Sequence, residues 1–242
     1  MTEHTVKKFD TELENIRSRV LAMGGLVEQQ ITSAMDGLAS GNLDMLESVI
    51  KNDEKVNRHE VELDEACAHI IAKRQPTAID LRMVMMVIKT ITDLERIGDE
   101  AKKFAKRGRA MHRDVSGKDS AKGSLGVIPR IDLMPMVTVA VAMLRMALDA
   151  FARVDTSTSA LVARQDQEVD AGFKSAMRQL ITYMMEDPRT ISSSLELIFI
   201  AKAIERIGDH AKNISEYVVY MAMGRDVRHI GIAEMEKEIA QN

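Results

Sequence analysis

Apolar residues recur every three or four positions along six long stretches of this chain, the spacing of a helix that buries one face. The stretches cover residues 5–39, 43–73, 79–110, 131–153, 157–186 and 190–223. Short turns separate neighbouring stretches at residues 40–42, around Pro76 and around Pro188. The pattern predicts three long antiparallel helices in each half of the chain.

A charged segment rich in Gly and Ser, residues 114–126, interrupts the pattern at the middle of the chain. Before and after it the same features recur. The pentapeptide at residues 95–99 (ERIGD) returns unchanged at residues 205–209, an offset of 110, and the residues around Asp53 match those around Asp166 at an offset of 113. A repeat of this length indicates a duplicated domain.

The predicted fold is therefore all-α: two tandem three-helix bundles, six long helices in all, related by an approximate two-fold axis. The predicted boundaries are residues 1–113 for the first bundle, 114–127 for a linker, 128–224 for the second bundle and 225–242 for a loosely attached acidic C-terminal tail.

Composition excludes several classes of protein. The net charge of -4, from 33 basic and 37 acidic residues, argues against a nucleic-acid binder. The single cysteine, Cys67, is interpreted as a small apolar helix residue and suits a reducing compartment. The longest uncharged run, residues 133–144, is 12 residues long, whereas a membrane helix needs about 20. Since no signal peptide is visible either, we expect a soluble, cytoplasmic protein without direct membrane insertion.

The candidate chemistry lies in pairs of oxygen-bearing side chains four residues apart, which share one helix face. Glu95 and Asp99 form such a pair on the third helix. Because Pro76 marks the turn, the equally distant pair on the second helix lies at the same height. The second half repeats the arrangement about Pro188. The sequence thus predicts two patches, Asp53, Asn57, Glu95 and Asp99 in the first half and Asp166, Asp170, Glu205 and Asp209 in the second.

Three interpretations of these patches are open. They bind divalent cations, they form a structural network with Arg96, Arg206, Lys102 and Lys212, or they are a solvated face. We favour the first because half-buried carboxylates that face each other need neutralising, and four pairs recur at matching heights. All-oxygen ligation suits Mg or Mn, with Fe or Zn as further candidates. Gly98 and Gly208 weaken their helices, which indicates close approach by a neighbour or ligand.

The motifs of common enzymes are missing from the sequence. There is no Glu-x-x-His pair of the di-iron type, no Gly-rich phosphate loop and no Cys-x-x-Cys. His210 follows Asp209 directly, but its counterpart in the first half is Glu100, so the repeat does not support it as a ligand. We expect a protein that is not an enzyme.

The duplicated plan, the paired Glu-Arg-Ile-Gly-Asp helices and the Asp-x-x-Val-Asn/Asp helices before them resemble the PhoU family. Segments at residues 23–30, 71–77 and 178–187 carry the same resemblance, which covers about residues 5 to 235. It implies a cytoplasmic negative regulator of phosphate uptake and of the phosphate-starvation response. Such a regulator couples the ATPase subunit of the phosphate ABC transporter to a membrane histidine kinase.

The resemblance also implies that the eight patch residues hold metal and that the protein forms a homodimer. Asn57 departs from the family motif because an amide stands where an acid is expected. The alternative function is a metal-dependent phosphate-handling enzyme or a metal-storage protein that uses the same carboxylates.

Overall fold

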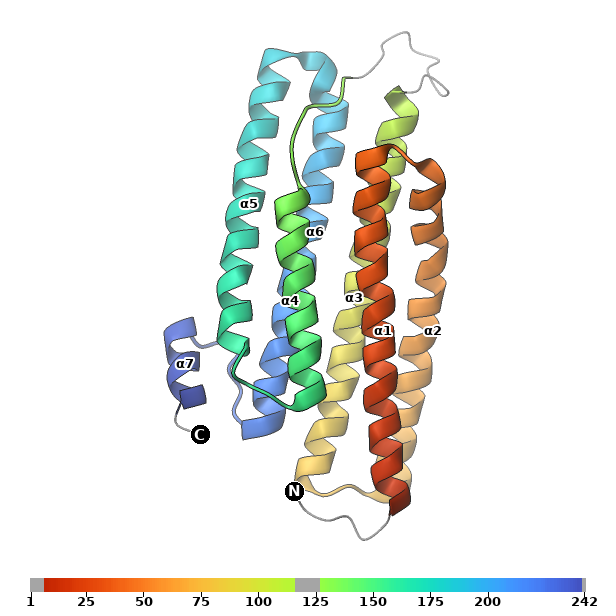
Figure 1. The fold of residues 1–242 in the computed structure, drawn as a ribbon, viewed down its shortest axis with the longest axis vertical. Helices are drawn as coiled ribbons and strands as arrows, with labels where there is room; N and C mark the ends of the chain where they lie inside the picture. The colour runs from red at the N-terminus through yellow and green to blue at the C-terminus, as the bar shows by residue number, and fades with distance from the viewer. Residues whose placement is uncertain (1–6, 116–126, 241–242) are drawn as a thin grey trace.

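The computed structural model describes residues 7–115 and 127–240, and helices make up most of both segments (Figure 1). The helices are α1 (Lys7–Ser40), α2 (Leu43–Arg74), α3 (Ala78–Val115), α4 (Met134–Arg153), α5 (Ser159–Glu186), the 3-10 turn η1 (Pro188–Thr190), α6 (Ile191–Met223) and α7 (Ile232–Ala240). Each of the six predicted stretches corresponds to one long helix. The largest differences are at α3, which continues to Val115, and at α4, which begins at Met134.

Local sequence explains where the helices begin and end. The Asn42 side chain accepts a hydrogen bond of 3.0 Å from the backbone N–H of Met45 and so caps the start of α2. Pro135 lies in the first turn of α4, where its missing N–H would have no helical partner. α6 ends at Gly224, whose φ of 71° is a left-handed conformation that favours glycine.

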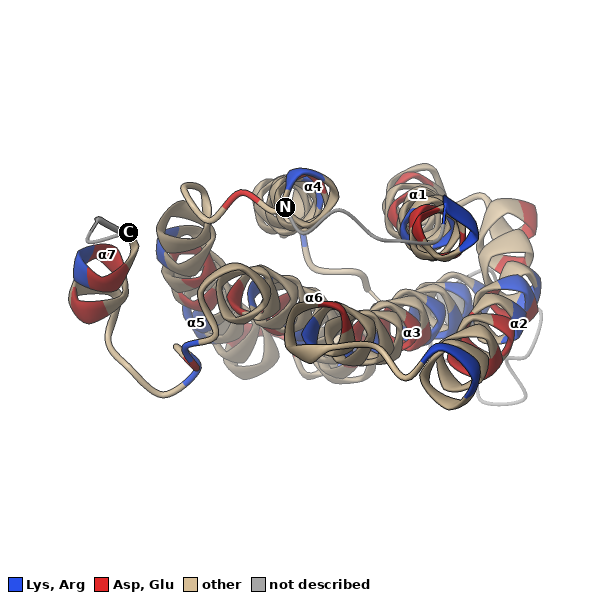
Figure 2. Cartoon of the chain, turned by 90° about the horizontal axis from the view of Figure 1, so that it is seen from below, with Lys and Arg blue, Asp and Glu red and all other residues tan. Residues whose placement is uncertain are grey.

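The six long helices form two three-helix bundles side by side, which confirms the predicted all-α fold. Seen from below, α5, α6, α3 and α2 lie in one row, and α4 and α1 cover the same side of it (Figure 2). α3 and α6 run in opposite directions at the centre and form the main contact between the halves. The apolar core runs through both bundles without interruption.

α4 is the most apolar long helix, and among the described residues it alone is long and apolar enough to span a membrane by length and composition. Its inner side chains, including Met143, Leu144 and Ala147, are completely buried in the second bundle. The core of a helical bundle therefore accounts for its composition. Cys67 is likewise buried, and burial raises the pKa of its thiol to about 12, as expected for a packing residue.

The chain after Gly224 differs from the loose tail that the sequence predicted. Val227 and Met235 are each 1% exposed and pack with Val219 of α6 in a small second cluster. The short helix α7 lies against α5 (Figure 1). The prediction was wrong because the charged residues of this segment obscured its few apolar anchors. Most of the predicted linker, residues 116–126, lies outside the described residues, and the division at 114–127 stays a prediction.

Candidate functional site

The first predicted patch gathers where α2 meets α3. Asp53 is 1% exposed, and its Oδ2 accepts a hydrogen bond of 2.7 Å from the Lys102 ammonium. The same ammonium lies 3.8 Å from Asp99 Oδ1. Burial raises the pKa of Glu95, and the neighbouring charges of Asp99 and Asp53 raise it further. Three of the four predicted side chains therefore share one electrostatic site with a lysine at its centre.

Two oxygen atoms of this patch lack a hydrogen-bond partner. Asp53 Oδ1 and Asn57 Oδ1 are both buried, and no group of the described residues donates to either. Buried acceptors normally have partners, so an unpaired oxygen indicates a missing donor, water or ion. Asn57 therefore offers an unpaired oxygen on the same helix as Asp53, although it carries no charge.

Gly98 explains how the helices approach each other at the patch. A Cβ on Gly98 would lie 3.2 Å from Gln30 Oε1, 3.2 Å from Val56 Cγ1 and 3.6 Å from Asp53 Oδ1. The close approach predicted for this glycine is confirmed. At Gly208 the nearest atom, Val169 Cγ1, would be 3.6 Å away, so the second bundle is less tightly packed here.

The second patch repeats the first between α5 and α6. Asp166 is 7% exposed, and its Oδ2 accepts a hydrogen bond of 2.9 Å from Lys212. Burial, followed by repulsion from Glu205, Asp166 and Asp170, raises the pKa of Asp209 to about 6. The other three predicted residues of this half are therefore close enough to act on Asp209.

The two lysines are equivalent in the repeat, since Lys102 and Lys212 are 110 residues apart like the two pentapeptides. Each donates to the buried aspartate of its own bundle. The second patch has an additional cation, because Lys202 lies 2.6 Å from both carboxylate oxygens of Glu205. The first-half counterpart of Lys202 is Thr92, which has no charge.

The two arginines of the pentapeptides behave differently. Arg96 Nε lies 3.8 Å from Glu95 Oε2 on an exposed part of the first patch. Arg206 makes its ion pair outside the second patch: its Nη1 lies 3.1 Å from Oε1 of Glu100, which belongs to the first bundle and is 3% exposed. Arg206 therefore links the bundles, a role that the sequence analysis did not predict.

A second cross-bundle contact was also missed. Asp93 of α3 is 6% exposed, and its Oδ1 lies 2.6 Å from Nδ1 of His210 on α6. The same oxygen accepts from Asn213 Nδ2 at 3.3 Å. Neither Asp93 nor His210 has a counterpart of the same kind in the other half, so the repeat could not reveal them. The signal available in the sequence was a lone acid on the apolar face of its helix.

The chemistry of both patches fits a hard divalent cation, because every donor is an oxygen and the first patch has two unpaired ones. In both patches a lysine ammonium group donates to the buried aspartate. Among the described residues, no three His, Cys, Asp or Glu side chains are close enough to form a ligand set as they stand. A metal would thus have to displace Lys102 or Lys212 from its aspartate. A solvated face does not fit, since Asp53 and Asp166 are buried.

Comparison with known families gives a double match. The family model described as PhoU domain matches residues 20–108 and again residues 133–218. The two matches begin 113 residues apart and end 110 residues apart, in agreement with the offsets of the repeat. Each match lies within one bundle.

Comparison with curated proteins and solved structures gives relatives over nearly the whole chain. The phosphate-specific transport system accessory protein PhoU homolog of Pseudomonas aeruginosa is 42% identical, covering 100% of this chain and 96% of the relative. The accessory protein PhoU of Escherichia coli is 43% identical over 99% of this chain and 95% of its own length.

Solved structures agree with the sequence comparison. A crystal structure of PhoU from Pseudomonas aeruginosa aligns with a TM-score of 0.81 at 42% identity, covering 90% of this chain and 100% of that one. The phosphate transport system regulatory protein PhoU of Streptococcus pneumoniae aligns with a TM-score of 0.79 at 27% identity, over 90% of this chain and 99% of its own.

Proposed function

This chain belongs to the PhoU family, and from that premise we propose that it is a cytoplasmic negative regulator of phosphate uptake and of the phosphate-starvation response. The observation that carries the proposal is the near full-length similarity to accessory and regulatory proteins of phosphate transport. Both bundles match the family, so the proposal applies to the whole chain.

The mechanism that we propose is docking without catalysis. The protein would act as an adaptor between the ATPase subunit of the phosphate ABC transporter and a membrane histidine kinase, and would work as a homodimer. A surface suited to docking supports this role. Ile191, Leu195 and Phe199 recur every four residues on α6 and are 42%, 45% and 50% exposed. Exposed apolar stripes of this kind are typical of interaction surfaces.

Metal binding is the regulatory part of the proposal. Asp53, Asn57, Glu95 and Asp99 would hold one divalent ion, and Asp166, Asp170, Glu205 and Asp209 a second, with Mg or Mn preferred and Fe or Zn as further candidates. A bound ion would neutralise carboxylates that now repel one another and would release the Lys102 or Lys212 ammonium. The charge of each patch would therefore depend on metal.

The test is a pull-down with the full-length tagged chain from phosphate-replete cells, with and without a chelator. We expect the transporter ATPase subunit and the histidine kinase to be recovered, and Phe199→Ser to reduce their recovery. Val61→Ser on α2, where the wild-type side chain is 57% exposed, is the matched control and should not. Recovery of neither partner would contradict the adaptor role.

Metal binding and the alternative function are tested separately. Titration with Mn and Mg should show saturable binding to the wild type that is lost in the Asp99→Ala/Asp209→Ala variant, and equal binding to both would refute the metal sites. Turnover of phosphomonoesters by the metal-loaded protein, lost on Glu205→Ala, would favour the enzyme. Sedimentation of the purified protein tests the homodimer.

A further inference from the structure

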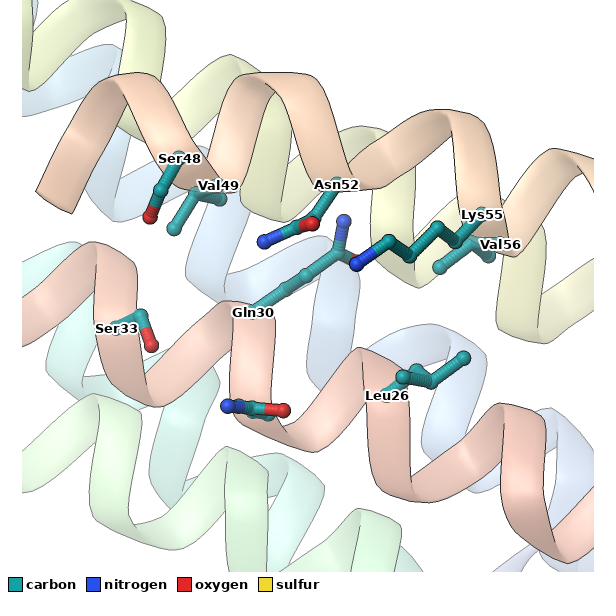
Figure 3. A pocket seen from close by; sticks show the side chains of 9 residues that line it. Leu26, Gln30, Ser33, Ser48, Val49, Asn52, Lys55 and Val56 are labelled. Atoms are coloured by element: carbon teal, nitrogen blue, oxygen red, sulfur yellow. The ribbon is translucent and has the colours of Figure 1, made fainter.

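A polar pocket lies between α1 and α2 in the first bundle, beside the carboxylate patch. Its volume is about 170 Å³, and its polar lining consists of Gln29, Gln30, Ser33, Ser48, Asn52 and Lys55. The side chains of Gln30, Asn52 and Lys55 reach toward one another across it (Figure 3). None of the residues that line it is acidic.

Gln30 is the residue that needs an explanation. It is 5% exposed, and neither atom of its side-chain amide has a hydrogen-bond partner among the described residues. Its Oε1 faces Gly98, at 3.2 Å from where a Cβ would stand. Figure 3 shows the Gln30 side chain extending toward α2, with Asn52 and Lys55 on that facing helix. Leaving a buried amide unpaired destabilises a protein, so the Gln30 amide indicates a partner that the described residues do not supply.

The charge and the hydrogen-bond donors around the pocket indicate which kind of ligand it suits. Within the described part of the chain, no acidic side chain forms an ion pair with the Lys55 ammonium. Asn52 adds an amide donor and Ser33 a hydroxyl, and no hydrogen bond within the described residues engages either group. The Ser48 hydroxyl already donates to the Met45 carbonyl at 2.7 Å. One cation with several neutral donors and no carboxylate is a lining that suits a small anion.

The second bundle provides an internal comparison. At the offset of 113, Gln30, Ser33, Ser48 and Lys55 correspond to Met143, Met146, Leu161 and Glu168. Met143 takes the place of Gln30 beside the equivalent glycine, where its Cε would lie 3.7 Å from a Cβ on Gly208, and it is completely buried. The fold therefore accepts an apolar side chain at this position, and the glutamine and lysine of this pocket are features of the first bundle alone.

We propose that this pocket binds a small tetrahedral oxyanion, of which inorganic phosphate and sulfate are the simplest examples. Lys55 supplies the charge, and Gln30 and Asn52 donate hydrogen bonds. The site goes beyond the proposed adaptor function, because it needs neither a metal nor a partner protein. It would give the first bundle a direct response to the concentration of the anion.

The experiment is calorimetric titration of the full-length protein with inorganic phosphate and, separately, with sulfate, in chelator so that no metal recruits the anion. We expect saturable binding of both anions, competition between them, and at least a tenfold weaker affinity for Lys55→Glu and for Gln30→Met. These substitutions introduce the residues of the second bundle. Lys51→Glu is the matched control: it makes the same charge change one turn earlier, on a side chain that is 75% exposed and does not line the pocket, and it should retain binding.

Several results would overturn the proposal. Absence of saturable binding, or equal weakening by Lys51→Glu and Lys55→Glu, would show that the anion responds only to net surface charge. If Gln30→Met raises the melting temperature and leaves anion affinity unchanged, the pocket holds water alone. Circular dichroism confirms that each variant is folded before the titration is interpreted.

Discussion

Replacing Lys102 with Met removes the ammonium group that neutralises Asp53 and leaves the carboxylate in the core. The aspartate is 1% exposed, its Oδ2 lies 2.7 Å from Nζ, and the Lys102 side chain is 27% exposed. Breaking a buried ion pair by removing one partner costs about 3–5 kcal/mol. Because water reaches part of Lys102, we expect a loss of roughly 3 kcal/mol in the free energy of unfolding. At about 2–4 °C per kcal/mol for a chain of this size, the melting temperature should fall by roughly 6–12 °C.

The second bundle contains a matched comparison for this variant. The side chains of Lys212 and Asp166 are 34% and 10% exposed, and the pair is 2.9 Å apart. Water can therefore solvate more of the carboxylate after Lys212→Met. We expect a smaller loss of roughly 1–2 kcal/mol. In the double variant Lys102→Met/Asp53→Asn the buried position 53 carries no charge, so much of the stability lost in the single variant should return.

Thermal and urea unfolding in chelator measures these differences, and the same unfolding in Mn or Mg then tests the metal proposal. With its competing ammonium removed, the Lys102→Met protein should bind the ion more tightly than wild type and recover melting temperature. A fall of less than about 1 kcal/mol for Lys102→Met would refute the assigned pairing. A full loss of stability without recovery in either ion would show that the patch is a structural network and not a metal site.

Three further predictions concern single positions. The pKa of Asp209 is raised from its ordinary value of 3.8 to about 6 in the folded protein, so the stability gained from its protonated form is present at low pH and lost as the pH rises through about 6. Asp209→Asn should therefore flatten the pH dependence of the melting temperature between pH 4 and 6. At pH 8 it should stabilise the protein by on the order of 1 kcal/mol, a small gain because water screens the charge of this exposed side chain. Gly208→Ala should stabilise α6 by roughly 0.5–1 kcal/mol, whereas Gly98→Ala should gain less in urea unfolding because its Cβ would crowd Gln30 and Val56 at 3.2 Å. Met235→Ala should lower the free energy of unfolding measured with urea by roughly 1–3 kcal/mol and speed proteolysis of α7. No change in either would contradict the packing of this segment.

The sequence correctly predicted the features that depend on a single helix or a single helical hairpin. Helical rise is nearly constant, so residues equally distant from Pro76 meet at one height, and the lysine between Asp53 and Asp99 bears this out. Because the second half repeats the first, the same argument predicted the position of the second patch. Glu205 and Asp166 indeed both raise the pKa of Asp209.

Contacts between the bundles could not be predicted from the spacing of residues along the chain. Arg206 and Glu100 are far apart in the chain, as are Asp93 and His210, and they meet only because α3 packs against α6. The spacing of apolar residues fixes which face of a helix is buried, but the partner of that face and its axial register depend on packing.

By itself the sequence determined the all-α fold, the duplication and the positions of the paired acids, because helix periodicity and hairpin register are local properties of the chain. Tertiary structure alone decided that lysine ammonium groups neutralise Asp53 and Asp166, that Arg206 joins the two bundles, and that Gln30 lies unpaired beside a pocket. Each of these depends on which side chains share a desolvated space, and a chain's helical pattern does not specify this.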